Sequence, residues 1–244
     1  MRIHALLGIG ALVASCPIAG ATTVLQVDFE NSIDPGGGVP VITQAGWTAM
    51  VVSNAPSPTV STVTDTIGGV GITLTAGGAG GIFQGRAANT WNNMVGTSWN
   101  NMVEDVIAAR SGDGTISINL TGLTDTLDYT LTVWHNVSAV DSASFAGGFY
   151  AITPSVTTGT LVGTATNGQS TNWDRTDGKS DADFINSVIS FNSSGGNADL
   201  LLTSASTSQF LVMSGLQLDA VPEPSSATLL GLGGLALALR RRRL

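Results

Sequence analysis

The feature that most constrains the fold is a series of short stretches in which apolar and polar residues alternate. Clear examples are VGITLT at 70–75, TISINL at 115–120 and LDYTLTV at 127–133. Successive side chains of a strand point to opposite faces, so each stretch offers one face to a core and one to solvent. Similar stretches lie at 22–29, 47–52, 149–153, 159–164, 184–191, 199–203 and 210–218. Short strands separated by turn residues predict an all-β fold, an antiparallel β-sandwich or jelly roll.

One stretch departs from this alternation. Met102, Val103, Val106 and Ile107 recur at helical spacing, so we expect one short helix that lies over the sandwich or closes one end of it. This stretch overlaps an internal repeat, WNNMV at 91–95 and again at 99–103. A single duplication does not indicate a solenoid.

The composition of the body, residues 22–220, excludes several classes of partner and of site. It contains four basic and sixteen acidic residues, a formal charge of −12. Nucleic acid and anionic lipid are poor partners for such a surface. Abundant Thr, Ser, Asn and Gly with little Lys is typical of a secreted β-protein with polar, uncharged faces. The body has no cysteine, which excludes an internal disulfide, a thiol nucleophile and a cysteine metal site.

The N-terminus predicts export. Residues 1–21 contain a basic start, an apolar run from 5 to 14 and a small-residue exit at 19–21, the pattern of a secretory signal peptide cleaved after Ala21. LVASC at 12–16 also resembles a lipobox, in which Cys16 becomes the lipidated first residue of a lipoprotein. The alternative is a chance cysteine in a hydrophobic leader, which the small-residue exit favours.

The C-terminus, residues 221–244, predicts a membrane anchor. Residues 227–239 are apolar or glycine, and as a transmembrane helix they would cover about 20 Å of a hydrocarbon core about 30 Å thick. Snorkelling arginine stems and local thinning allow this short helix to span. The basic cluster that follows stays cytoplasmic, so the body lies outside. Its members are Arg240, Arg241, Arg242 and Arg243.

These C-terminal residues resemble the PEP-CTERM sorting signal of Gram-negative bacteria. The match consists of Pro222, Glu223 and Pro224, then the apolar run, then the arginines. The resemblance implies an exosortase-type processing enzyme as partner and cleavage near the tripeptide. It also implies a precursor anchored in the inner membrane, with its body in the periplasm, that reaches the cell surface or an exopolysaccharide matrix. The alternative is a plain anchor that is never cut. The two prolines favour an extended segment that a protease can bind.

A second resemblance concerns architecture alone. Residues 122–134 resemble a strand pair of fibronectin type III and related sandwich domains, in which a tyrosine after the turn hydrogen-bonds back across a corner. The resemblance implies this role for Tyr129.

Two groups of side chains are candidates for ligand binding. The first comprises tryptophans that could stack on sugar rings, Trp91, Trp99, Trp134 and Trp173. Trp134 follows the threonine side of its strand, so we expect it to be exposed. The second is a carboxylate cluster that could bind calcium, formed by Asp174, Asp177, Asp181 and Asp183. Arg175 and Lys179 lie within this run, which favours a solvated, self-paired loop and no cofactor.

The sequence gives catalysis little support. His135 is the body's only histidine, and Glu30 and Glu104 are its only glutamates, the pair on which a glycosidase would depend. We therefore predict a non-enzymatic surface or matrix protein, structural or adhesive, that binds polysaccharide. The alternative is a carbohydrate-active enzyme, a glycosidase or lyase, on the same scaffold.

Overall fold

The computed structural model describes residues 20–31, 43–53, 60–78, 83–87, 105–109, 114–134, 152–166, 186–204 and 211–221. Within these residues every regular element is a strand, so the all-β prediction is confirmed for this part of the chain. Ala21–Val221 form one compact unit. The predicted signal peptide and C-terminal helix lie outside the described residues, apart from Gly20, Ala21 and Val221.

The largest sheet has six strands in the order β10-β11-β8-β14-β1-β2. All neighbours are antiparallel except β1 and β2, which are parallel. The first and last strands of the fold, β1 and β14, are therefore hydrogen-bonded neighbours inside this sheet. The strand bounds are Thr160–Leu161 for β10, Asn186–Asn192 for β11, Asp128–Trp134 for β8, Gly215–Val221 for β14, Thr22–Asn31 for β1 and Thr48–Ser53 for β2.

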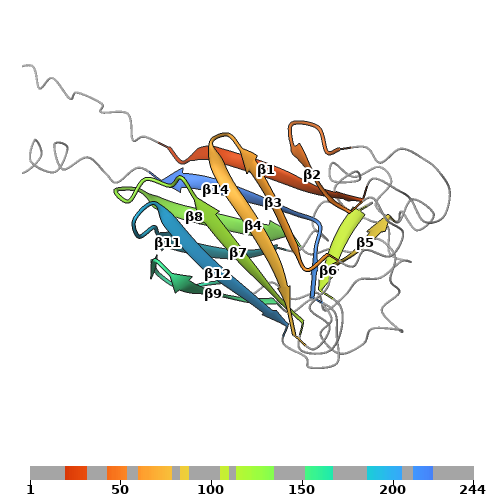
Figure 1. The fold of residues 1–244 in the computed structure, drawn as a ribbon. Coiled ribbons are helices and arrows are strands. Elements are labelled where there is room, and N and C mark those ends of the chain that lie inside the picture. Colours follow the sequence, from red (N-terminus) through yellow and green to blue (C-terminus); the bar gives the residue numbers. More distant parts are fainter. Residues whose placement is uncertain are drawn as a thin grey trace, which may run out of the picture. The chain divides into compact units, whose positions relative to one another are not determined.

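The second sheet has five antiparallel strands in the order β3-β4-β7-β12-β9 (Figure 1). Its alternation is regular, with every second residue of β4 buried. The buried residues Val70, Ile72 and Leu74 are those predicted to face the core. The strand bounds are Thr62–Ile67 for β3, Val70–Gly77 for β4, Thr115–Thr121 for β7, Asn197–Ser204 for β12 and Ile152–Thr158 for β9.

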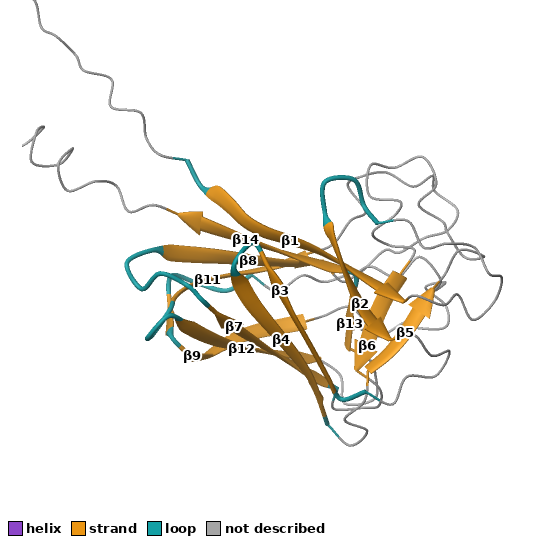
Figure 2. Cartoon of the chain, turned by 45° about the horizontal axis from the view of Figure 1, so that its top comes forward, coloured by secondary structure: helices purple, strands orange, loops and turns teal. Residues whose placement is uncertain are grey.

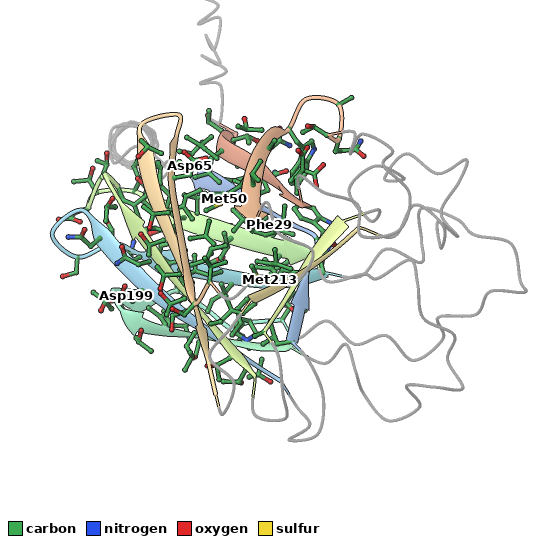
Figure 3. All side chains as sticks on the ribbon, turned by 45° about the vertical axis from the view of Figure 1, so that its right-hand side comes forward. Phe29, Met50, Asp65, Asp199 and Met213 are labelled. Carbon is green, nitrogen blue, oxygen red and sulfur yellow. The ribbon has the colours of Figure 1, made fainter. Side chains whose placement is uncertain are left out.

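Figure 2 shows the two larger sheets as two layers, with a small third sheet at one end. The third sheet has the order β13-β6-β5, with bounds Leu211–Met213, Asp105–Ala109 and Phe83–Ala87. All three sheets contribute to one buried cluster. Phe29 from β1, Met50 from β2 and Met213 from β13 are at most 1% exposed and lie in its interior (Figure 3). The inner faces therefore pack as a sandwich.

The prediction of a short helix around 102–110 is wrong for residues 105–109, which form β6. Ile107 and Ala109, two positions apart, are both buried. A helix would place them on nearly opposite sides, whereas a strand places them on one face. β6 pairs with β5 on one side and β13 on the other, so its backbone hydrogen bonds are made by a sheet.

The tyrosine bond implied by the fibronectin-like strand pair is confirmed. The Tyr129 hydroxyl accepts a hydrogen bond of 2.8 Å from the backbone N–H of Thr124, five residues upstream. The ring is 3% exposed and stacks on Phe191, with centroids 5.8 Å apart and planes at 23°. Tyr129 therefore joins the turn before β8 to the core.

Candidate functional site

Two acidic side chains of β1 hold the segment that precedes β2. Asp28 is only 1% exposed, and its Oδ2 accepts a hydrogen bond of 2.6 Å from the backbone N–H of Gln44. The carboxylate of Glu30, two residues further along the strand, accepts a hydrogen bond from the Thr43 hydroxyl. Residues 43–44 are thus fixed to β1 by two charge-assisted hydrogen bonds, which are stronger than neutral ones.

The same segment brings a tryptophan against β8. Trp47 meets Trp134 edge to face, with ring centroids 5.1 Å apart and planes at 76°. Trp134 is 7% exposed, so the prediction that it lies on the surface is wrong. Its neighbour on β14 is Gly215, which has no side chain to compete for the space. Alternation placed Trp134 on the correct side of its strand, but the sequence could not show that Trp47 packs against Trp134 and covers it.

The other polar surface belongs to the five-stranded sheet. Most of its outward side chains carry hydroxyls, and we call this surface the hydroxyl face. All of its members are exposed or half-buried. They are Thr62, Thr64, Thr66, Thr73, Thr75, Thr115, Ser117, Asn119, Thr121, Thr153, Ser155, Asp199, Leu201 and Thr203.

Neighbouring strands are linked across the hydroxyl face. The Thr64 and Thr73 hydroxyls are 3.1 Å apart and hydrogen-bonded. Asn119 donates a hydrogen bond of 2.6 Å from Nδ2 to Oδ1 of Asp199. The face is also closely packed around β4, because the Thr121 hydroxyl occupies the space where a Cβ on Gly71 would lie. These contacts hold the side chains of Thr64, Thr73, Asn119, Asp199 and Thr121 in place.

Seven acidic side chains accept hydrogen bonds from the protein itself. For Asp125 the donors are the Ser193 hydroxyl and the backbone N–H of Gly196, at 2.6 and 2.8 Å. The Ser193 hydroxyl, followed by backbone N–H groups, holds the pKa of Asp125 below its ordinary value of 3.8. The seven are Asp28, Glu30, Asp65, Asp125, Asp128, Asp199 and Asp219. Six of these carboxylates link separate segments of the chain, while Asp65 accepts from the backbone N–H of the adjacent Thr66.

The body ends where the C-terminal segment begins. β14 runs to Val221, and the predicted cleavage tripeptide starts at the next residue. Residues 220–243 match the family model of the PEP-CTERM protein-sorting motif. The match begins at Ala220, which is 8% exposed and lies inside β14 opposite Thr22, so the motif starts within the folded body. No curated protein and no solved structure shows a significant match to the chain.

The PEP-CTERM motif confirms the resemblance seen in the C-terminal residues. It identifies the chain as an exported protein that an exosortase processes and sorts to the cell envelope. The part of the chain that the structure describes contains no helix long and apolar enough to cross a membrane. It also contains no group of three or more His, Cys, Asp or Glu side chains placed to hold a metal ion.

The remaining predicted site residues lie outside the described residues. They are Trp91, Trp99 and Trp173 of the sugar-binding prediction, Asp174, Asp177, Asp181 and Asp183 of the calcium prediction, the motif residues Pro222, Glu223 and Pro224, and Arg240 to Arg243. Cys16, His135 and Glu104 lie outside them as well. The hydroxyl face was not predicted from the sequence, although its pattern, threonine at alternate positions of several strands, is present there.

Proposed function

We propose that the protein is a non-enzymatic, structural or adhesive component of the cell surface or exopolysaccharide matrix. The hydrogen bonding of the acidic groups carries this proposal. Glu30, one member of the glutamate pair considered for glycosidase chemistry, binds Thr43, and its neighbour Asp28 binds Gln44. A glycosidase needs two carboxylates facing a shared sugar-binding space, one of them free to transfer a proton. Carboxylates that hold neighbouring chain segments support a structural role instead.

The position of β14 supports display and release at the membrane. The strand lies between β1 and β8, and the motif continues from it without a linker. Cleavage at the tripeptide would free the whole sandwich to enter a matrix. Association with polysaccharide through Trp91, Trp99 and Trp173 belongs to the same proposal.

The proposal is tested by expressing the full chain in its own host, with and without the exosortase-type enzyme. With the enzyme we expect a polypeptide that lacks residues 1–21 and the segment after the tripeptide, recovered with the matrix. Without the enzyme we expect the longer precursor in the membrane fraction. Recovery from the cytosol with both ends intact would overturn the proposal, and so would hydrolysis of the matrix polysaccharide by the purified protein.

A matched pair of variants tests the role of the tripeptide. Glu223→Ala combined with Pro224→Ala should leave the protein in the membrane at precursor mass. Ser225→Ala combined with Ser226→Ala, adjacent in sequence but outside the tripeptide, should be processed normally. Equal processing of both variants would mean that the protein is not cut at this motif.

A further inference from the structure

We propose that the hydroxyl face of the five-stranded sheet is a binding surface for a neutral polysaccharide. This inference rests on the proposed function, because it names the polymer and the surface through which the sandwich would join a matrix. It differs from the tryptophan prediction, since the hydroxyl face contains no aromatic residue.

The hydroxyl face is a two-dimensional array. Thr64, Thr73, Asn119 and Asp199 stand in register across β3, β4, β7 and β12. A second row, formed by Thr62, Thr75, Ser117, Leu201 and Ser155, crosses all five strands. Neighbouring strands lie about 4.8 Å apart, so the second row is about 19 Å long, and successive rows are about 6.8 Å apart. Such a surface offers hydrogen-bonding groups at regular intervals along a polymer.

The chemistry of the array matches that of sugars. A threonine or serine hydroxyl both donates and accepts hydrogen bonds, as a sugar hydroxyl does. Threonine is restricted at χ1, and pairs such as Thr64 with Thr73 are already hydrogen-bonded, so little side-chain freedom is lost on binding. Each hydrogen bond between a sugar and an exposed side chain contributes little to the binding free energy, because water competes for both groups. Useful affinity therefore requires many bonds at once, so the ligand is a polymer and not a monosaccharide.

Charge selects a neutral polymer. The hydroxyl face carries one acidic residue, Asp199, and its residues include no lysine or arginine. The body as a whole has sixteen acidic and four basic residues. An anionic polysaccharide would be repelled by this protein, while a neutral one meets no such barrier. Binding to a neutral polymer should also depend little on salt concentration.

The outward face of the six-stranded sheet provides an internal comparison. There, as on the hydroxyl face, polar side chains bond to one another. Gln26 Nε2 donates to Gln217 Oε1 at 2.9 Å, Gln217 donates to Asp219 at 2.8 Å, and the Thr130 and Ser190 hydroxyls are 2.9 Å apart. The two sheets thus offer polar faces of similar composition. If equivalent substitutions are made on both faces, a loss of binding on one face alone indicates a specific site, whereas an equal loss on both indicates an effect of general surface polarity.

The test uses the exported protein purified from its host. Affinity electrophoresis would be run through gels that contain dextran, a β-glucan, a mannan or a galactan, with alginate as the anionic polymer. The variant Thr73→Val, Thr75→Val, Ser117→Ala removes three central hydroxyls and keeps residue sizes close to the original. The matched control is Thr130→Val, Thr132→Val, Ser190→Ala on the six-stranded sheet. Circular dichroism and thermal unfolding check that both variants are folded.

We expect retardation by at least one neutral polymer and none by alginate. The face variant should bind at least about tenfold more weakly, because it loses three hydrogen-bonding groups, and the control should bind as the original does. Equal weakening in both variants, or retardation by alginate alone, would overturn the inference. So would a protein that is found in the matrix but binds no neutral polymer, an outcome that leaves the proposed function intact.

Sedimentation velocity tests the competing occupant, a second copy of the chain. If the original protein is a dimer and the face variant a monomer, with no polymer bound by either, the hydroxyl face is an interface between copies and the inference is wrong. A monomer in both cases, together with polymer binding, agrees with it.

Discussion

Replacing Tyr129 by phenylalanine tests how the turn before β8 is held. The change removes one hydroxyl and leaves the ring, so the contact with Phe191 is retained. What is lost is the 2.8 Å hydrogen bond from the backbone N–H of Thr124. Thr124 is exposed, and water can replace part of this bond.

The expected cost follows from that exposure. A typical intramolecular hydrogen bond contributes about 0.5–1.5 kcal/mol, and a buried donor left without a partner costs about 1–3 kcal/mol. Because the donor lies near solvent, we expect Tyr129→Phe to lower the free energy of unfolding by about 1 kcal/mol. In a body of this size that corresponds to a decrease in Tm of about 2–4 °C.

Urea unfolding of the exported protein, followed by tryptophan fluorescence and circular dichroism, measures this change. The slope against urea should stay constant, since the surface exposed on unfolding is unchanged. Phe191→Leu is the control that removes the stacked ring but keeps the hydrogen bond. If hydroxyl and ring act independently, Tyr129→Phe costs the same in both backgrounds. A cost below about 0.3 kcal/mol would refute the stabilising role of the bond.

Three further predictions concern stability. Hydrogen bonds lower the pKa of Asp125 in the folded protein, so its ionised carboxylate stabilises the fold above the unfolded pKa, and this stabilisation is lost as pH falls below about 4. Asp125→Asn should therefore make Tm fall less steeply on the acid side of a Tm-against-pH curve. Gly122→Ala places a Cβ 2.7 Å from a backbone oxygen at positive φ, and unfolding should occur at markedly lower urea than for Gly163→Ala, which is also at positive φ but has open space around it. An exported chain ending at Ser214 should fail to fold, while one ending at Val221 should give the original circular dichroism spectrum, because β14 contains two fully buried leucines.

Alternation in the sequence predicted the strands whose inner rows are strongly apolar. The stretches at 70–75 and 115–120 became β4 and β7, and their apolar residues became core. β3 was missed because TVTDTI has threonine at every outward position and Asp65 on the other side. β4 supplies its hydrogen-bonding partner through the two-residue turn Gly68–Gly69, in which both glycines have positive φ. This Gly-Gly hairpin pattern is local, but alternation alone does not include it.

The two errors of site and structure share a cause. Ile107 occurs in a sequence whose apolar residues fit a helix, and Trp134 follows threonines on the outward side of its strand. In each case distant segments decide the outcome. β5 and β13 pair with β6 on both sides, and Trp47 packs against Trp134 from 87 residues away. Long-range pairing in a β-sandwich therefore limits what local periodicity can predict.

The position of β14 links the fold to export. β1 is the first strand to leave the membrane and β14 the last, yet Thr22 lies opposite Ala220 in the same sheet. β8 also needs β14 as its neighbour, so the sheet cannot close until Val221 has crossed. At that moment the sorting motif is the next segment to follow. The sandwich therefore needs residues up to Val221 to complete its core, and a cut after Val221 removes no residue on which that core depends.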